Sequence, residues 1–507
     1  MRTVLVTVLA AALPFAPGCG ARGSMKTGTG GTGAAGGAGG TPAVQSFAVI
    51  PTRNQLDLLF VVDDVNAAAE QAKLAAQAAS FVQVLERAPR GTPDLHVAVV
   101  TSDLPVATNA PIRCSPAGEA GAFQTAPGPD QPCDQPPLAD GASFLSQNGE
   151  IRNFSGDLGV AVSCLLRAGA RGCGFDQPLA AAARALGADG APAPAGNAGF
   201  LRANATLAIV VLANQDDCSA PPQTELFSLQ TGQSSLAEPL GPLTPYRCNR
   251  YGHLCKGPDG NVAIPPLVPP AGAPTAALSD CTDDKSGQGE LIPVDQLVQQ
   301  LRSLKRDPDN QIVVAAIVAP PAPYGVAWRP AGMANPQNPG EPWPRILHAC
   351  GPAGDEDVNP AAAQLTTDGT LGDPAVRLTQ FANAFPNHAL ASVCDPSYAA
   401  VMTTIAASVG ALPTPDCIDP SVPAGADGQP LCTVVRHQVT DTTDQQATVR
   451  NCGADSGLSP CWTSRADVPG CSAGATALQI QDDTWGAGTT VYYDVSCPLC
   501  PGAAGCP

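Results

Sequence analysis

Basic residues are few in this chain: Lys and Arg total 26 against 44 Asp and Glu, and the formal net charge is −18 over 507 residues. No basic patch offsets this charge, so the protein repels phosphate backbones and anionic lipid headgroups. Nucleic acid is therefore excluded as a partner. Aromatic residues are also scarce, at 4%, whereas Gly and Pro number 52 and 53. This composition predicts a chain rich in loops.

Several motifs that mark catalytic or cofactor sites are absent as well. The sequence contains no HExxH zinc motif and no GxSxG nucleophile turn. Gly28, Gly30 and Gly33 match the spacing GxGxxG, but neither a strand nor a helix flanks them, so we interpret them as linker. Cys497 and Cys500 have the spacing of a redox pair, yet they lie among six other cysteines and favour a structural role. No catalytic residue is predicted.

The N-terminus resembles a bacterial lipoprotein signal. Arg2 precedes an apolar run at residues 4–12 that is too short to span a bilayer, and the segment ends on Gly18-Cys19. The resemblance implies that residues 1–18 are removed and that Cys19 carries lipid. Residues 19–45, mostly Gly, Thr, Ala and Ser at their start, are then a flexible tether at the outer membrane or cell surface. A plain secretory signal, giving a secreted protein, is the alternative.

The cysteine count supports an oxidising compartment. Of 19 cysteines, 18 remain if Cys19 is lipidated, and these can pair completely. Ten of them lie between Cys114 and Cys394, and eight between Cys417 and Cys506. Each block can close on itself, which predicts two disulfide-bonded units, although the sequence does not fix the pairing.

Apolar runs alternate with helical patterns through most of the chain. Buried strands are predicted at residues 56–62, 95–101, 206–212 and 312–318, with amphipathic helices between them, including one at 294–305. This alternation predicts an α/β fold with a doubly wound, mostly parallel sheet at 46–411. Pro/Gly/Cys-rich stretches at 107–153, 220–289 and 320–369 are expected to be long insertions stapled by disulfides. Residues 412–507 are predicted to form a small disulfide-rich β unit.

Four segments occur in one order that resembles a known family. They are LLFVVDD at 58–64, LHVAVVTSDL at 95–104, GCGFDQPLAAAARAL at 172–186 and NAGFLRANATLAIVVLANQDDCSAP at 197–221. Together they are similar to surface lipoproteins of myxobacteria and related bacteria that carry a von Willebrand factor type A-like domain. The resemblance covers roughly residues 50–410, and it implies a doubly wound fold with a divalent metal at the carboxyl ends of the strands.

That implied metal site is degenerate in this sequence. The family loop supplies an Asp and two hydroxyls, but here Asp63 is followed by Val65 and Ala67 at the hydroxyl positions, and Asn214 replaces a later acidic ligand. A standard Mg²⁺ site is not expected, because Mg²⁺ requires a nearly complete oxygen shell. The full set of rim residues is Asp63, Asp64, Asn66, Asn214, Asp216 and Asp217.

Two other interpretations of these acidic residues stay open. Asp63 and Asp64 are placed to cap the N-terminus of the following helix, where carboxylates meet free N–H groups. Alternatively, Ca²⁺ accepts looser geometry and more ligands than Mg²⁺, so a substitute calcium site is conceivable. Its ligands would be Asp64, Asn66, Asp216 and Asp217. We expect no resident cofactor as the leading interpretation.

These observations favour a non-enzymatic, membrane-anchored surface protein that binds a surface or envelope protein, or mediates adhesion, without a standard metal site. One alternative is a secreted or anchored hydrolase with its site in the long insertions. Convergence of a histidine with Asp, Glu or Ser in one cleft would favour it; the histidines are His96, His253, His348, His388 and His437. The other alternative is a metal-dependent adhesin that uses substitute ligands.

Overall fold

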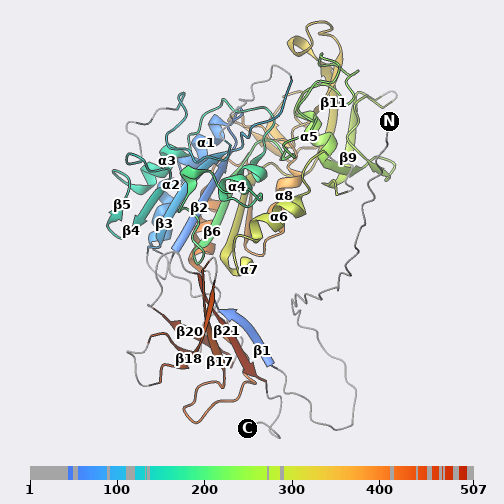
Figure 1. Cartoon of the computed structure of the whole chain (residues 1–507). Coiled ribbons are helices and arrows are strands. Elements are labelled where there is room, and N and C mark those ends of the chain that lie inside the picture. Colours follow the sequence, from blue (N-terminus) through green and yellow to red (C-terminus); the bar gives the residue numbers. More distant parts are fainter. Residues whose placement is uncertain are drawn as a thin grey trace, which may run out of the picture. The chain divides into compact units, whose positions relative to one another are not determined.

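A central sheet of seven strands organises the larger part of the chain (Figure 1). The computed structural model describes residues 44–49, 55–87, 92–109, 120–131, 133, 138–270, 273–285, 290–411, 416–440, 443–453, 459–466, 471, 474–482 and 490–499. In spatial order the strands are β15 (His388–Ser392), β10 (Ile312–Val318), β6 (Thr206–Leu212), β2 (Gln55–Val62), β3 (Asp94–Thr101), β4 (Leu145–Asn148) and β5 (Ile151–Arg152). The first five are parallel to one another, and β4 and β5 add an antiparallel edge.

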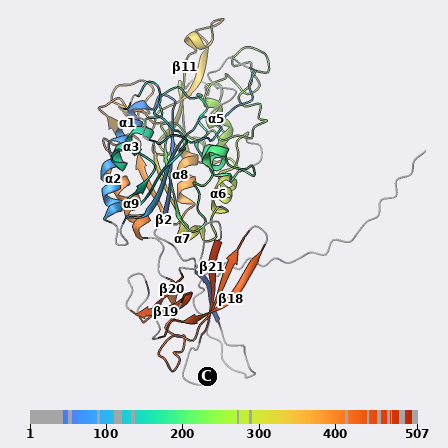
Figure 2. The same cartoon turned by 60° about the vertical axis from the view of Figure 1, so that its left-hand side comes forward.

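Helices cover both faces of this sheet, as Figure 2 shows. One face packs against α1 (Ala68–Ala75), α2 (Ala78–Glu86), α3 (Leu158–Leu165) and α9 (Ala399–Ala411). The other packs against α4 (Pro178–Leu186), α6 (Val294–Arg302) and α8 (Val376–Asn383). Within β2, Leu58 and Phe60 belong to the first core, and Leu59 and Val61 to the second. The strand is continuously apolar because both of its faces are buried.

Local sequence signals explain where two of these helices begin and end. Asp157 caps α3, and its side chain accepts a hydrogen bond of 3.1 Å from the Val160 N–H. Proline at the first turn of α4 costs no hydrogen bond, and Gly187 ends this helix with φ of +71°. Shorter helical segments are η1 (Ala195–Asn197), α5 (Tyr246–Gly252), α7 (Pro308–Gln311) and η2 (Gly332–Ala334).

A five-stranded antiparallel sheet is built from the segments between β6 and α8. Its order is β12 (Pro342–Ile346), β11 (Tyr324–Pro330), β9 (Thr275–Asp283), β7 (His253–Lys256) and β8 (Val262–Ala263). The disulfide Cys255–Cys281 joins β7 to β9. A parallel pair, β13 (Cys350–Pro352) and β14 (Gln364–Thr366), follows in the chain, and Cys350 is bonded to Cys394.

The C-terminal residues form a second seven-stranded sheet with its own core. Its order is β1 (Val44–Val49), β21 (Thr490–Pro498), β17 (Thr433–Val439), β18 (Asp444–Asn451), β19 (Cys461–Ala466), β20 (Thr476–Gln481) and β16 (Cys417–Ile418). The first and last described strands are neighbours, since Val44 to Val49 pair antiparallel with Pro498 to Tyr493. Three disulfides cross-link this unit: Cys417–Cys471, Cys432–Cys497 and Cys452–Cys461.

The fold class predicted from the sequence, a doubly wound α/β chain with a small β unit at its C-terminus, is wrong. Among the described residues, strands account for 31% and helices for 20%. The stretches at 220–289 and 320–369, expected to be stapled loops, contain the antiparallel sheet, and the C-terminal sheet has as many strands as the central one. Proline made part of the antiparallel sheet hard to recognise as strand from the sequence. β12 has two prolines, which its position at a sheet edge tolerates.

Each of the seven disulfides within the described residues joins two cysteines of the same predicted block. Cys133–Cys164, Cys218–Cys248, Cys255–Cys281 and Cys350–Cys394 stay in the first block, and the other three stay in the second. The expected start of the first domain after residue 45 falls inside β1, which pairs with the C-terminal sheet. Cys19 lies outside the described residues. No helix in the described part is long and apolar enough to cross a membrane.

A buried ion cluster holds the amino-terminal end of β2. Asp57 is fully buried and accepts hydrogen bonds of 2.7 Å from both the backbone N–H and Nε of Arg202. The Lys305 ammonium lies 3.8 Å from the same carboxylate. Asp57 and Lys305 are fully out of water and depend on each other for compensation, whereas Arg202 is partly exposed and also pairs with Asp94 at 2.8 Å.

Replacing Asp57 with alanine should therefore destabilise the fold by about 3–5 kcal/mol, because two cations would lose their buried partner. Denaturant unfolding with the disulfides intact measures this change. The matched control is Asp130→Ala, which breaks an ion pair with Arg171 in which both side chains are more than half exposed. That change should cost no more than about 1 kcal/mol, and equal losses in the two variants would contradict the argument.

Candidate functional site

The predicted site residues lie in the loops that follow β2 and β6. We define the rim as these loops together with the loop after β3: residues 63–66, 102–106 and 214–220. The three strands are parallel neighbours, so their carboxyl ends lie along one edge of the sheet. The Asp63 N–H donates to the Leu212 carbonyl, and the Ser102 N–H to the Val62 carbonyl, which extends the strand pairing into the rim.

Asp63 is fully buried in the rim and its oxygens are already hydrogen-bonded. Oδ1 accepts from the Val65 N–H at 2.7 Å, and Oδ2 accepts from the Asn214 N–H at 3.2 Å. Burial is the main cause that raises the pKa of Asp63 to about 7, and the nearby charge of Glu70 adds to it. Asn214, expected only as a lost ligand, thus contacts Asp63 through its backbone.

Asp176 is the partner that the sequence did not reveal. It is a neighbour of Asp63, and burial together with the Asp63 charge raises the pKa of Asp176 well above the ordinary value. Two buried carboxyl groups side by side cannot both ionise cheaply, so at least one of them keeps a proton. The Ser102 hydroxyl donates to Asp176 Oδ1 at 2.7 Å and lies 3.4 Å from Asp64 Oδ1.

Asp64 completes this group and packs against backbone. Its carbonyl accepts from the Gly172 N–H at 2.9 Å, and a side chain at Gly172 would begin only 2.4 Å from Asp64 Oδ1. Both Ser102 and Asp176 had a sequence signal that was not used. Ser102 follows a predicted strand directly, and Asp176 precedes a predicted helix.

Asp216 and Asp217 belong to a different network, centred on Arg377. The Arg377 side chain is 1% exposed and bonds Asp217 Oδ2 at 2.9 Å, Asp283 Oδ1 and the Ile292 carbonyl. Asp216 accepts from the backbone N–H groups of residues 377 and 378, in the first turn of α8, at 2.8 and 3.1 Å. It also accepts from His253 Nε2 at 2.8 Å.

The pKa values in this network follow from the available donors. Burial is the largest influence on Asp216 and acts to raise its pKa, but His253 and the two backbone N–H groups together bring the pKa below its ordinary value. For Asp217, burial prevails over Arg377 and Ser219, and the pKa is raised. The oxygens of Asp216 therefore bond the first turn of α8, and those of Asp217 bond Arg377.

The calcium interpretation required Asp64, Asn66, Asp216 and Asp217 to converge, and the structure gives them separate surroundings. Asn66 is exposed in the left-handed region, with φ of +56°, which asparagine tolerates. Within the described residues, no group of three or more His, Cys, Asp or Glu is placed to hold a metal ion.

The helix-cap interpretation of Asp63 and Asp64 is wrong. The N-cap of α1 is Ala67, which makes no side-chain hydrogen bond. Asp63 instead accepts from the N–H two residues further on, which stabilises the turn that precedes the helix.

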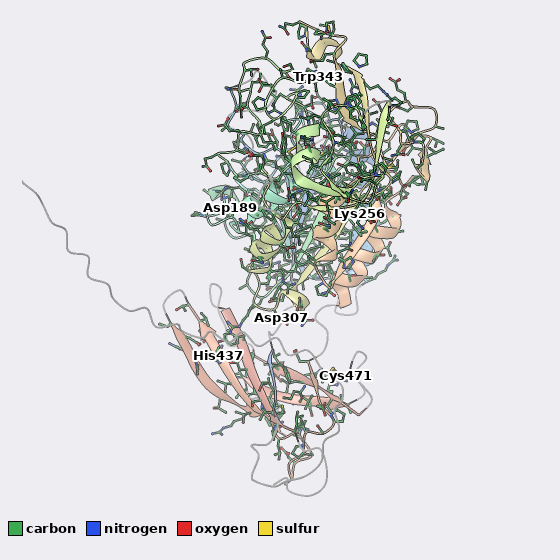
Figure 3. All side chains as sticks on the ribbon, turned by 90° about the vertical axis from the view of Figure 1, so that its right-hand side faces the viewer. Asp189, Lys256, Asp307, Trp343, His437 and Cys471 are labelled. Carbon is green, nitrogen blue, oxygen red and sulfur yellow. A yellow bond between two sulfur atoms is a disulfide. The ribbon has the colours of Figure 1, made fainter. Side chains whose placement is uncertain are left out.

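The five histidines are dispersed rather than gathered in one cleft. A ring nitrogen of His96 contacts the Phe200 carbonyl, and one of His388 the Phe385 carbonyl. His253 joins Asp216, and His437 lies beside Asp444 and Asp494 in the C-terminal sheet. His348 is the member that lines a cavity: its Nδ1 lies 2.6 Å from Asp373 Oδ1 in a hollow of about 330 Å³ beside Trp343, labelled in Figure 3. Asp357 lines the same hollow, so one histidine meets two carboxylates in a cavity, whereas the other four histidines are dispersed. The lining of this hollow contains no serine or cysteine that could act as a nucleophile.

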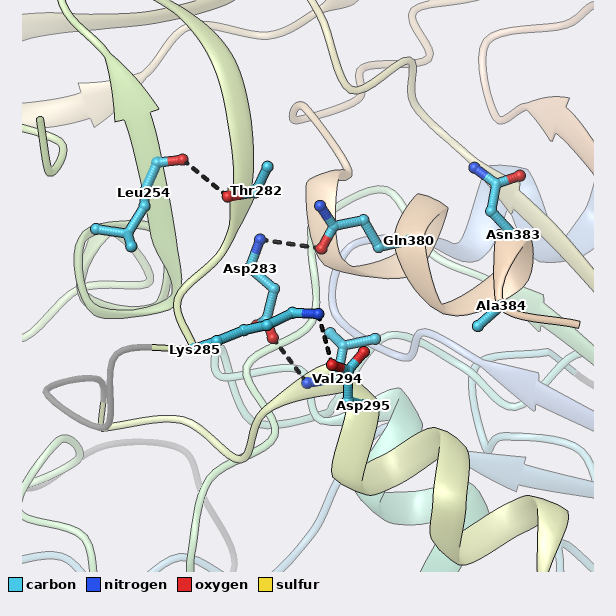
Figure 4. A pocket seen from close by; sticks show the side chains of 9 residues that line it. All are labelled: Leu254, Thr282, Asp283, Lys285, Val294, Asp295, Gln380, Asn383 and Ala384. Atoms are coloured by element: carbon cyan, nitrogen blue, oxygen red, sulfur yellow. Dashed lines mark hydrogen bonds and ion pairs between the residues drawn. The ribbon is translucent and has the colours of Figure 1, made fainter. Parts of the chain in front are cut away.

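A wide, shallow hollow lies beside α6 and α8 (Figure 4). Its main polar groups are satisfied by one another. Lys285 Nζ lies 2.5 Å from Asp295 Oδ2, and Asp283 accepts from the Val294 N–H while its own N–H donates to Gln380 Oε1. Few donors or acceptors are left there for a ligand.

A second hollow, between α4 and α6, differs in this respect, and we call it the amide pocket. Its volume is about 490 Å³, within the range of ligand sites in proteins. It is lined mainly by apolar residues from the rim and the two helices, and by glutamine side chains: Leu104, Pro105, Val106, Ala120, Gln177, Ala180, Ala183, Arg184, Asp189, Ala220, Pro221, Pro222, Phe227, Leu291, Ile292, Pro293, Gln296, Leu297 and Gln300. Sequence reasoning did not identify it, because its walls come from five separate segments.

Comparison with known proteins identifies no family for this chain. No family model matches the chain, and no curated protein does. Among solved structures, the pilus adhesin SpaC of Lactobacillus rhamnosus GG, in an open conformation, matches with a TM-score of 0.27 and 9% identity over 92% of this chain and 43% of that one. The pilus adhesin RrgA of Streptococcus pneumoniae matches with a TM-score of 0.18 and 11% identity over 90% and 58%.

This chain spans less than two thirds of the length of either adhesin. Similarity at these TM-scores does not establish a shared fold, so neither match carries an argument about function. The matches also do not bear on the resemblance to von Willebrand A-like surface lipoproteins, which stays a prediction.

The Asp63–Asp176 pair predicts a pH dependence of stability. The pKa of Asp63 is about 7 in the folded protein, against 3.8 for an ordinary aspartate. Between these values the folded chain keeps a proton that the unfolded chain releases, so stability should fall as pH rises from about 4 to 7. The variant Asp63→Asn should reduce this slope by at most about 1.4 kcal/mol per pH unit, the contribution of one proton, because the buried Asp176 keeps its own raised pKa.

Urea unfolding of the parent and the variant at several pH values from 4 to 8 measures the slope. Asp140→Asn, a change at an exposed turn, is the control and should leave the slope as in the parent. If Asp63→Asn and the parent respond equally to pH, the proton is not held at this pair.

Proposed function

We propose that this is a non-enzymatic cell-surface protein, held to the membrane by lipid on Cys19, that binds another protein or mediates adhesion without a standard metal site. The disulfides support an extracytoplasmic location, because such bonds persist in oxidising compartments. Whether the protein stays at the surface or is released then depends on the anchor.

The observation that carries the binding proposal is the construction of the amide pocket. Val106, Ala220, Phe227 and Leu291 line the pocket and belong to one buried cluster that also contains the disulfide Cys218–Cys248. The disulfide therefore cross-links the buried cluster that supplies these four lining residues, which restrains the wall of the pocket. A preformed, mainly apolar hollow binds with a small ordering cost, which suits recognition.

The rim carboxylates support a binding mode that does not use metal. Asp217 is bonded to Arg377 and Asp216 to His253, and the pKa values of Asp63 and Asp176 are both raised. A metal-bridged contact with a carboxylate of a partner has no support from these groups. We therefore expect a partner protein to be held by packing and hydrogen bonds.

A capture experiment tests this function. The full chain, immobilised as bait, should retain at least one protein from envelope fractions of its source cells, and chelator should not release it. The double variant Cys218→Ser/Cys248→Ser should capture less, because the pocket loses its cross-link. The control, Cys452→Ser/Cys461→Ser, removes a disulfide of the C-terminal sheet and should capture as well as the parent. No retained protein, or release by chelator, would sink the proposal.

The anchor makes a separate prediction. The variant Cys19→Ala should move from the membrane fraction to the soluble fraction and should incorporate no labelled palmitate, because the thiol that would carry the lipid is gone. Fractionation and labelling of growing cells measure both effects. A change at the neighbouring residue, Gly20→Ala, is the control and should leave the protein on the membrane. If the parent itself incorporates no palmitate, the protein is secreted instead.

A further inference from the structure

The hollow that contains His348 is lined by polar side chains from distant parts of the chain, and we call it the polar hollow. Its volume is about 330 Å³, at the small end of the range for ligand sites. The lining comes from the rim, the start of α5, β12 and the segments around β13 and β14: residues 215, 244–246, 249, 331, 334, 343–346, 348, 357 and 373. Trp343 marks its place in Figure 3.

Backbone hydrogen bonds hold the segments of the polar hollow together. The His348 N–H donates to the Asp357 carbonyl at 2.8 Å, and the Asp373 N–H donates to the Asn214 carbonyl at 2.8 Å. The disulfide Cys350–Cys394 restrains the chain just after His348. These segments are therefore placed before a ligand binds, which lowers the ordering cost of binding.

The charged groups of the polar hollow are paired with one another. His348 Nδ1 lies 2.6 Å from Asp373 Oδ1, and Asp357 accepts from Arg329 Nε at 3.0 Å and lies 3.6 Å from the Arg345 guanidinium. Burial acts to lower the pKa of His348, but the bond to Asp373 and the charges of nearby aspartates raise the pKa above its ordinary value. An ionic ligand of either sign would meet a like charge beside each opposite one, which disfavours ions.

Several hydrogen-bonding atoms in the polar hollow are still open to a ligand. The side chains of His348 and Arg345 are 24% and 50% exposed, and Gln215 is half-buried. Within the described part of the chain, His348 Nε2, the Arg345 guanidinium and the Gln215 amide make no hydrogen bond, and none of these atoms is buried. The carboxylates of Asp357 and Asp373, 19% and 17% exposed, add acceptors.

This mixture of accessible donors and acceptors matches neighbouring hydroxyl groups. A hydroxyl both donates and accepts, so it can donate to an aspartate while it accepts from Gln215 or Arg345. Hydrogen bonds to charged groups are the stronger ones. The C–H groups of a sugar ring would pack on apolar parts of the lining, such as Pro245 and Ile346. A hydrocarbon would strip water from the polar atoms without replacing its hydrogen bonds.

We propose that the polar hollow binds an uncharged sugar residue through its hydroxyl groups. A peptide unit, with one donor and one acceptor, would satisfy fewer of these side chains than a ring that carries several hydroxyls. The inference goes beyond the proposed function and involves a hollow other than the amide pocket.

The probes for the test are the methyl glycosides of glucose, galactose, mannose and N-acetylglucosamine. Each is titrated into the full chain carrying Cys19→Ala, so that no detergent is needed, and binding is followed by saturation-transfer NMR and calorimetry. At least one glycoside should bind. Gln215→Met and Arg345→Met should each weaken its binding about tenfold, the value of one hydrogen bond. Because Gln215 bonds no described residue, its replacement removes no hydrogen bond of the described fold.

Matched controls and comparison ligands complete the test. Gln299→Met and Arg171→Met, at exposed positions outside the polar hollow, should bind like the parent. Acetate, methylammonium and isobutylbenzene stand for anionic, cationic and apolar occupants, and each should bind more weakly than the best glycoside. The proposal is overturned if no glycoside binds, if Gln215→Met and Arg345→Met both bind as the parent does, or if a comparison ligand binds more tightly.

The envelope capture experiment separates this inference from the proposed function. A glycoside that binds while capture fails leaves the sugar site standing and removes the proposed function. Capture of an envelope protein without binding of any glycoside does the reverse.

Discussion

The buried guanidinium of Arg377 is the constraint around which the rim is arranged. It joins Asp217, at the end of β6, to Asp283, at the end of β9, and to the Ile292 carbonyl before α6. A charge without water must be paired, so these segments cannot separate without exposing an uncompensated ion. Asp216 extends the same network to the first turn of α8 and to His253. One side chain therefore fixes where the antiparallel sheet meets the central sheet.

The buried carboxyl groups in the rest of the rim are compensated without a cation. Asp63 and Asp176 are buried with no basic side chain bonded to them among the described residues, and their raised pKa values favour protonation in place of a counter-ion. In both parts of the rim the buried acidic groups are compensated, by bonds to Arg377 or by raised pKa values, although the chain as a whole carries a charge of −18. The part of the rim that lines the amide pocket is apolar: Leu104, Pro105, Val106 and Ala220.

Much of the central sheet could be predicted from the sequence, because its signals are local. The runs at 206–212 and 312–318 match β6 and β10 residue for residue, since strands buried on both faces are continuously apolar. The antiparallel sheet could not be predicted in this way. β9 has small residues at several positions and an irregular burial pattern, and β1 pairs with β21 across almost the whole chain. Strands that pair across so many residues leave no periodic signal in the sequence. Because these pairings were not predicted, the predicted fold class was wrong.

The candidate site shows why residue type alone does not determine chemistry. Asp63 and Asp216 are both buried, both follow a strand of the central sheet, and both were assigned to one degenerate metal shell. Their pKa values nevertheless move in opposite directions. The difference comes from partners that are remote in sequence. Asp216 accepts hydrogen bonds from His253 and from two N–H groups of α8, whereas Asp63 lies beside a second carboxyl group. Sequence position could locate these carboxylates at the rim, but only the fold decides which of them is an anion.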